Sequence, residues 1–258
     1  MKRPIVGNSR PCTDIDQTTE NTVPASNVNP PQPYWRRMRL IAHRGFASTA
    51  PENTISAIRS ATDRADAVEF DVRRCGSGEL VVIHDETIDR ITDGAGHVAD
   101  TTLAELERYT VLESDERIPT LPELLEAVPR AAEVNLELKT LGIAVDVLAA
   151  LEAADLENRV VTTSFLESEL RAIRELDPDQ PTGLLVSRHT KRPVTTAVEL
   201  DCDVIGANYW RCLSTRLVPR AKRVGLEVHA WSIERRLTAT LLEYRGVDCV
   251  SADRPLQV

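Results

Sequence analysis

The 258-residue chain has few lysines, few aromatic residues and no long apolar run. No segment approaches the roughly 20 consecutive apolar residues that a transmembrane helix needs, which argues against stable membrane insertion. Lys2 and Arg3 are followed by polar residues and prolines, so the first residues lack the apolar core of a secretory signal peptide. We therefore expect a cytoplasmic protein.

Positive charge comes almost entirely from arginine, because only Lys2, Lys139, Lys191 and Lys222 are lysines. Asp and Glu number 40 against 31 Lys and Arg, which gives a net charge of −9. An acidic chain is unlikely to bind nucleic acid nonspecifically, so we expect no nucleic-acid partner. An acidic, lysine-poor surface suits a high-salt cytoplasm, but a high genomic G+C content produces the same bias, and both explanations stay open.

The cysteines are odd in number and include no Cys-x-x-Cys pair. This spacing favours reduced structural thiols over a disulfide framework or a zinc site. The five cysteines are Cys12, Cys75, Cys202, Cys212 and Cys249.

Residues 1–37 differ in composition from the rest of the chain. They are polar, contain six prolines and show neither helical nor strand periodicity. Such a segment cannot bury enough apolar surface to offset the entropy of ordering it, so we predict a disordered tail. Met38 is the only methionine besides Met1 and directly precedes the first apolar strand. A natural start at Met38 is therefore an alternative.

From residue 38 onward, strand-like apolar segments alternate with helix-like amphipathic segments. Eight such units predict a single α/β domain over residues 38–258, a TIM (β/α)₈ barrel. An open doubly wound sheet is the alternative, although no Gly-x-Gly-x-x-Gly follows the first strand. Strands are expected at 39–42, 67–72, 133–138, 160–163, 183–186, 204–207, 227–231 and 247–251, with a short extended segment at 80–83. Helices are expected at 52–64, 143–153, 167–176, 195–200, 213–223 and 235–243.

Three carboxylates lie on predicted strands. Glu69 and Asp71 are two residues apart on the second strand and therefore project to the same side, and Glu137 lies on the next parallel strand. Catalytic groups of a parallel barrel gather at the carboxyl ends of its strands. Converging carboxylates repel one another unless a cation lies between them, and oxygen ligands suit Mg²⁺ or Ca²⁺ better than zinc. These residues predict a site for one divalent cation.

Two histidines and two basic residues end neighbouring segments. His43 and Arg44 follow the first strand, His84 follows the segment 80–83, and Lys139 follows Glu137 by two positions. Two histidines can act as general acid and general base near neutral pH. Arg44 and Lys139 can neutralise a phosphate. Together with the carboxylates, this set predicts phosphodiester hydrolysis.

Eight short motifs carry a resemblance to a known family. They are IAHRG at 41–45, PENT at 51–54, E-x-D at 69–71, LVVIHD at 80–85, IPTL at 118–121, ELK at 137–139, SF at 164–165 and ADRP at 252–255. In order and spacing they resemble the glycerophosphodiester phosphodiesterases, and the likeness covers residues 38–258.

This resemblance implies specific roles. Glu69, Asp71 and Glu137 would hold one Mg²⁺ or Ca²⁺, and His43 and His84 would act as acid and base. The implied reaction releases an alcohol and glycerol 3-phosphate from a small glycerophosphodiester. Either water attacks phosphorus directly, or a neighbouring glycerol hydroxyl attacks first and forms a cyclic phosphate.

The substrate-binding residues implied by the resemblance are Arg44, Lys139 and Trp231. Arg44 and Lys139 would contact the phosphate, whereas Trp231 would either line the substrate cavity or only pack. The family usually has Trp-Thr-Val-Asn late in the barrel, but this chain has Trp-Ser-Ile-Glu at 231–234. The departure leaves the head-group preference open.

Two other functions stay open. A lysophospholipase D acting on lysolipids would need an apolar extension of the cavity, and the low aromatic content argues mildly against it. A non-catalytic barrel that serves as a binding module would have lost a ligand or a histidine, and none is missing here. The sequence gives no oligomeric state.

Overall fold

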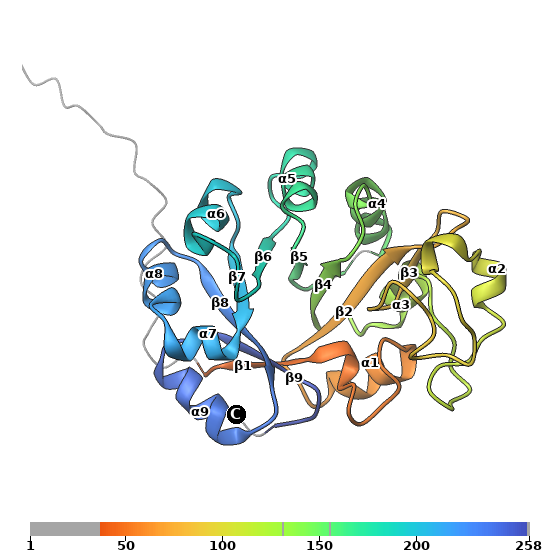
Figure 1. Ribbon diagram of the computed structural model, residues 1–258, viewed down its shortest axis with the longest axis horizontal. Helices are drawn as coiled ribbons and strands as arrows, with labels where there is room; N and C mark the ends of the chain where they lie inside the picture. The colour runs from red at the N-terminus through yellow and green to blue at the C-terminus, as the bar shows by residue number, and fades with distance from the viewer. Residues whose placement is uncertain (1–36, 131, 155, 257–258) are drawn as a thin grey trace, which may run out of the picture. The chain divides into compact units, whose positions relative to one another are not determined.

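Eight parallel strands close into a barrel in the computed structural model, which describes residues 37–130, 132–154 and 156–256 (Figure 1). β1 (Arg39–Ala42) pairs with both β2 (Ala67–Arg74) and β9 (Cys249–Ala252), and this double pairing closes the ring. The remaining barrel strands are β4 (Glu133–Leu138), β5 (Val160–Ser164), β6 (Thr182–Val186), β7 (Val204–Asn208) and β8 (Glu227–Ile233). The predicted TIM barrel is confirmed.

Helices surround the barrel on its outer side (Figure 1). Apolar residues from the helices and from the outward faces of the strands form the main core. The helices that follow barrel strands are α1 (Ile55–Thr62), α4 (Ala144–Ala154), α5 (Glu167–Leu176), α6 (Pro193–Glu199), α7 (Tyr209–Ser214), α8 (Leu217–Arg223) and α9 (Arg236–Tyr244).

Alternation along β2 separates the core from the barrel interior. Val68, Phe70 and Val72 are fully buried in the core between strands and helices. Glu69 and Asp71 therefore point to the opposite side, into the barrel. β4 continues this pattern, because its parallel register places Asn135 beside Glu69 and Glu137 beside Asp71. Adjacent strands thus deliver carboxylates to one place.

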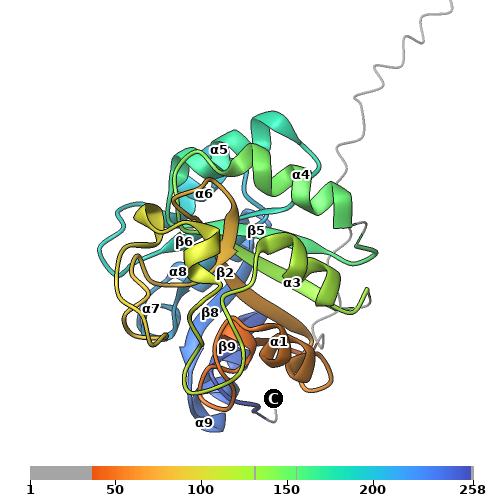
Figure 2. The same cartoon turned by 90° about the vertical axis from the view of Figure 1, so that its right-hand side faces the viewer.

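An extension with its own small core separates β2 from β4. It contains β3 (Leu80–Val82), the 3₁₀ turn η2 (Val98–Asp100) and α2 (Leu103–Leu106), whereas the helix that follows it, α3 (Leu121–Ala127), packs into the main core. β3 runs antiparallel to β2 outside the ring, and Ile83 N donates to Asp71 O at 2.9 Å. Figure 2 shows this side of the barrel facing the viewer. The extension brings the residues that follow β3 back to the carboxyl end of β2.

Two predicted helices differ from the observed ones. The helix predicted at 52–64 begins only at Ile55, because the Thr54 side chain caps it by accepting from Ala57 N at 3.3 Å. The helix predicted at 213–223 is divided into α7 and α8. Pro219 has no N–H to donate and is tolerated only in a first helical turn, so a helix containing it must begin shortly before it. The sequence prediction includes no helix between residues 84 and 132, where the structure has α2 and α3.

The predicted disordered tail at 1–37 lies outside the described residues, apart from Arg37. The longest helix in the described part, α4, has 11 residues, and no described helix is long and apolar enough to cross a membrane. Cys75, Cys202, Cys212 and Cys249 are buried and free.

Candidate active site

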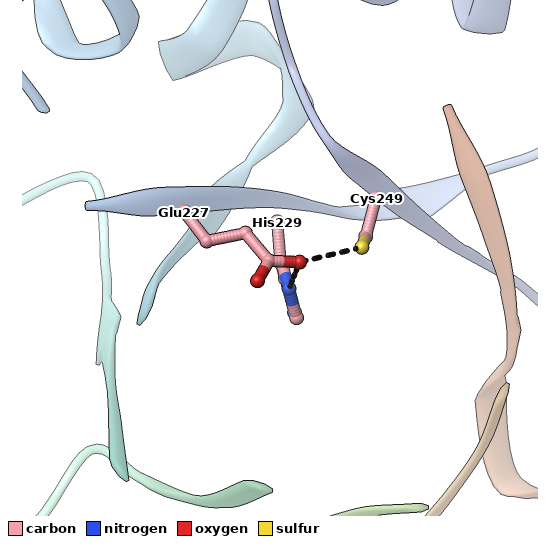
Figure 3. A group of neighbouring side chains, drawn as sticks. All are labelled: Glu227, His229 and Cys249. Carbon is pink, nitrogen blue, oxygen red and sulfur yellow. Dashed lines mark hydrogen bonds and ion pairs between the residues drawn. The ribbon is translucent and has the colours of Figure 1, made fainter. Parts of the chain in front are cut away.

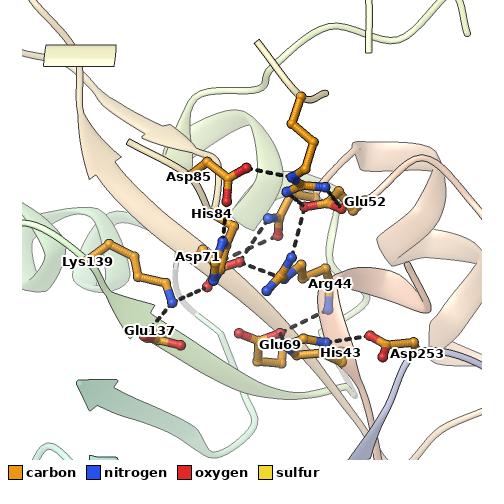
Figure 4. Close-up of polar contacts among 12 residues, drawn as sticks. His43, Arg44, Glu52, Glu69, Asp71, His84, Asp85, Glu137, Lys139 and Asp253 are labelled. Atoms are coloured by element: carbon orange, nitrogen blue, oxygen red, sulfur yellow. Dashed lines mark hydrogen bonds and ion pairs between the residues drawn. The ribbon is translucent and has the colours of Figure 1, made fainter. Parts of the chain in front are cut away.

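A cavity of about 230 Å³ opens at the carboxyl end of the barrel strands. Seven of the eight predicted site residues line it, and the eighth, Asp71, is fully buried directly beside them. Figure 4 shows the polar residues converging from β2, β4 and the segments that follow β1 and β3. The predicted residues in the lining are His43, Arg44, Glu69, His84, Glu137, Lys139 and Trp231.

The three buried carboxylates Glu69, Asp71 and Glu137 form the centre of the site. One oxygen from each lies within 4.8 Å of the others. Asp71 Oδ1 and Glu137 Oε1 are buried and share one ammonium group, Lys139 Nζ, at 3.2 and 2.6 Å. Three buried carboxylates that share so few positive charges are costly unless a further cation compensates them. The donor set therefore fits a hard divalent cation, with each residue offering an oxygen ligand.

The pKa values show how poorly the negative charge is compensated. Burial, followed by the charge of Asp71, raises the pKa of Glu137 to about 7. The same two causes raise the pKa of Glu69. Burial also acts on Asp71, but Lys139 and Arg44 outweigh it and lower the pKa of that carboxyl. The protein's own cations thus neutralise one of the three carboxylates well and the other two incompletely.

Two basic side chains border the carboxylates. Lys139 Nζ lies 2.6 Å from Glu137 Oε1 and 3.2 Å from Asp71 Oδ1. Arg44 Nε lies 3.3 Å from Asp71 Oδ2 and accordingly faces the same carboxylate from the other side. Both cations also line the cavity, where a phosphate would meet them.

The turn after β1 has an unusual backbone that fixes Arg44. Arg44 has φ 51°, and its N–H donates to Glu69 Oε2 at 2.9 Å. Gly45 has φ 73°, and a Cβ there would lie 2.8 Å from the carbonyl carbon of Ala57. Only glycine fits this position, which explains the His-Arg-Gly sequence physically. The turn therefore places the main-chain N–H of Arg44 against Glu69 and its guanidinium against Asp71.

Each histidine is held by an aspartate. His43 Nδ1 lies 2.6 Å from Asp253 Oδ1, and His84 Nδ1 lies 2.6 Å from Asp85 Oδ1. A carboxylate can only accept here, so each Nδ1 carries the proton and each Nε2 is left for the cavity. His43 Nε2 lies 3.9 Å from Glu69 Oε2. The arrangement presents two imidazole nitrogens with fixed tautomers.

The two histidines differ in their electrostatic surroundings. Burial lowers the pKa of His84, whereas Glu69 and Asp253 overcome burial at His43 and raise its pKa.

An outer layer of charged residues supports the site. Arg90 donates to Glu52 through two nitrogens, at 2.7 and 2.8 Å, and also to Asp85. Glu52 in turn accepts from Arg44 at 3.1 Å. Asn53, with φ 60°, donates to Asp71 Oδ2 at 3.0 Å. Glu52 and Asn53 therefore belong to the site, and Thr54 alone caps the helix.

Asp253, Asp85 and Arg90 are site residues that carry no predicted role. Asp253 follows the last strand, so the rule that selected His43 also applied to it. Arg90 lies in the extension, and no local pattern identified it.

Trp231 forms part of an apolar wall of the cavity. Its ring packs edge-on against Phe165, with centroids 5.8 Å apart, and Leu185 lines the same cavity. Trp231 Nε1 is buried without a hydrogen-bond partner. The residue thus combines packing with a polar atom that a bound molecule can satisfy.

A second polar cluster occupies the amino end of the barrel, and Figure 3 shows Glu227, His229 and Cys249 meeting there. Glu227 Oε1 lies 3.1 Å from His229 Nε2 and 3.2 Å from Cys249 Sγ. Arg39 also binds Glu227, and Arg159 reaches its second oxygen at 2.7 Å. A metal ion would have to compete with two guanidinium groups for Glu227, and burial raises the pKa of the Cys249 thiol well above its usual value. We assign this cluster a structural role.

A TIM barrel whose carboxyl end gathers three carboxylates, two aspartate-held histidines and two cations belongs to the class of phosphoric diester hydrolases. Comparison with known proteins agrees. The Glycerophosphoryl diester phosphodiesterase family matches residues 43–257, and the chain therefore belongs to this family.

Three relatives match this chain over nearly their full length. A glycerophosphodiester phosphodiesterase of Caldanaerobacter subterraneus is 33% identical over 229 residues, which cover 84% of this chain and 94% of the relative. The structure of an Oleispira antarctica phosphodiesterase in complex with the product sn-glycerol-3-phosphate is 30% identical, with a TM-score of 0.77, over 84% of this chain and 93% of that one. A glycerophosphodiester phosphodiesterase from Agrobacterium tumefaciens has a TM-score of 0.74 at 26% identity, over 85% and 97% of the two chains.

Proposed function

We propose that this enzyme hydrolyses glycerophosphodiesters to an alcohol and glycerol 3-phosphate, with one divalent cation and a histidine pair. The observation that carries the proposal is the group Glu69, Asp71 and Glu137, three buried carboxylates whose oxygens lie within 4.8 Å of one another between two aspartate-held histidines. Family membership and the product bound to the Oleispira antarctica relative support the substrate class.

Glu69, Asp71 and Glu137 hold Mg²⁺ or Ca²⁺ in this proposal. When bound, the ion polarises a phosphoryl oxygen and neutralises the charge that develops in the transition state. It also supplies the positive charge that the three carboxylates lack.

Arg44 and Lys139 bind the phosphate. Both are held by carboxylates on one side and face the cavity on the other, so they are positioned before substrate arrives. Their charges disperse the negative charge that builds up on the phosphoryl oxygens.

His43 and His84 move the protons. One neutral imidazole takes the proton of the attacking oxygen at Nε2, and the other, which starts as an imidazolium, donates its Nε2 proton to the departing alcohol oxygen. Asp253 and Asp85 stabilise whichever imidazolium forms and keep each ring in place. The attacking oxygen belongs to water or to a glycerol hydroxyl.

Cavity size favours a small diester over a lysolipid. About 230 Å³ accommodates a glycerophosphate group and a small alcohol, and the apolar wall is confined to a few side chains such as Trp231, Phe165 and Leu185. Trp231 would pack against the glycerol carbons.

The test is release of glycerol 3-phosphate from glycerophosphocholine with Mg²⁺, Ca²⁺ or EDTA, from low to molar salt. We expect release that needs a divalent ion and that Glu69→Ala abolishes. Lysophosphatidylcholine provides the second substrate. If the enzyme turned over the lysolipid and not glycerophosphocholine, its substrates would be lysolipids instead of small diesters. Release of glycerol 3-phosphate that survives both EDTA and Glu69→Ala would refute the cation mechanism.

A further inference from the structure

A groove with five arginines lies on the outside of the barrel, away from the catalytic cavity. It has a volume of about 460 Å³ and is bounded by α6, α7 and α8. None of its lining residues lines the active-site cavity. The arginines are Arg192, Arg211, Arg216, Arg220 and Arg223.

The groove reverses the charge of the rest of the molecule. Residues 187–226 contain eight Lys or Arg and only three Asp or Glu, whereas the chain as a whole carries −9. Scattered solvated arginines would not concentrate in one segment of an acidic chain. The basic segment therefore needs an explanation of its own.

Carboxylates do not neutralise this cluster. In the described part of the chain, the side chains of Arg216, Arg220 and Arg223 have no ion pair or hydrogen bond. Arg192 has one acid within range, Glu199, at 3.7 Å. Arg174, by contrast, lies outside the groove and binds Asp203 at 2.8 Å. Like charges gathered without counterions repel one another, and a bound anion would remove that cost.

One guanidinium is fixed in advance. Arg211 is half-buried, and its two terminal nitrogens donate to the main-chain carbonyls of Ser187 and Thr190, the latter at 2.8 Å. Carbonyl groups hold the side chain without cancelling its charge. A preorganised guanidinium loses little entropy when it binds an oxyanion.

We propose that the groove between α6 and α8 binds a phosphate-bearing anion through Arg211, Arg216, Arg220 and Arg223. Guanidinium groups match phosphate oxygens in geometry and charge. The volume is typical of a small-molecule pocket, so the ligand is a single phosphorylated group and not a nucleic-acid duplex. Two sources supply this chemistry, a free phosphorylated metabolite and the head group of an anionic lipid.

Calorimetric titration of the full chain with sodium pyrophosphate tests the site. The variant Arg220→Gln with Arg223→Gln removes two guanidiniums, and we expect binding about tenfold weaker. Arg235→Gln with Arg236→Gln is the matched control, because these exposed arginines at the start of α9 lie outside the groove and carry the same charge. Both variants should hydrolyse glycerophosphocholine at the wild-type rate.

Vesicles distinguish the two sources. One outcome is that the protein cosediments with phosphatidylglycerol vesicles but not with phosphatidylcholine vesicles. If Arg220→Gln with Arg223→Gln reduces this cosedimentation, the groove binds lipid head groups. Pyrophosphate binding without vesicle binding would assign it to a soluble ligand. If the double variant unfolds, Arg216→Gln replaces it. Equal binding of pyrophosphate and vesicles by the wild type, the groove variant and the α9 control would overturn the proposal.

Discussion

The two ends of the barrel contain similar residues in opposite electrostatic states. At the carboxyl end, Glu69, Asp71 and Glu137 crowd together, and Lys139 and Arg44 compensate their negative charge only in part. At the amino end, Glu227 lies between Arg39 and Arg159, and both of its oxygens are bound. The first arrangement needs a ligand to be stable, and the second is complete without one.

The pKa values express the same difference. Burial and a neighbouring carboxylate raise the pKa of Glu137 to about 7. Glu227 is half-buried, but His229 and the two arginines more than compensate for the lost solvent and lower its pKa. The incompletely compensated carboxylates at the carboxyl end serve ligand binding, whereas the compensated carboxylate at the amino end serves the stability of the barrel.

The largest expected effect comes from a substitution at the carboxyl end of the barrel. Glu69→Gln should reduce glycerophosphodiester hydrolysis by about a thousandfold or more, because the cation that binds the phosphate loses a negatively charged ligand. In EDTA its thermal midpoint should equal or exceed that of the wild type, since one repelling charge is gone. Activity assays and thermal unfolding measure both. A strongly lowered midpoint in EDTA would mean that the charge is structural.

A substitution at the amino end of the barrel should lower stability and leave activity nearly unchanged. Glu227→Gln should lower the free energy of unfolding by about 2–3 kcal/mol, because two half-buried guanidiniums lose the carboxylate that they share, although Arg39 keeps its ion pair with Glu133. The rate per folded molecule should stay within about twofold of the wild type. Denaturant titration gives the free energy. Exposed Glu152→Gln is the control, with less than about 0.5 kcal/mol expected.

A smaller effect on activity separates ligands from supporting residues. Asp253→Asn should lower kcat/KM by about ten- to a hundredfold, because His43 loses its orientation while the cation site stays intact. Stabilisation by added Mg²⁺ or Ca²⁺ should persist in this variant and vanish in Glu69→Gln. Loss of metal-induced stabilisation in Asp253→Asn would place Asp253 in the cation site itself.

The smallest expected effect is on the pH dependence of stability at the amino end of the barrel. The lowered pKa of Glu227 contributes stability that is present above the unfolded value near 4.5 and disappears as pH falls. The difference in unfolding free energy between the wild type and Glu227→Gln should therefore shrink from pH 6 to pH 3. Denaturant titrations at several pH values measure it. A difference that stays constant over this range would contradict the ion-pair account.

Much of the site could be predicted from short patterns. Glu69 and Asp71 alternate with core residues on one strand, and His43 ends an apolar barrel strand, so strand geometry alone brought these three to one end of the barrel. His84 follows β3, which runs antiparallel to β2 outside the ring, so its place depends on how the extension folds back. The division of the helix predicted at 213–223 also had a local signal, Pro219, which the periodic pattern concealed.

Other features depended on chain closure. Asp253 reaches His43 only because β9 pairs with β1, and Arg90 reaches Glu52 only because the extension folds back toward the first turn. The positions of the carboxylates followed from the sequence, because alternation along a strand is local. The charge that each carboxylate bears depends on burial and on partners far away in the chain, and only the tertiary structure decided that.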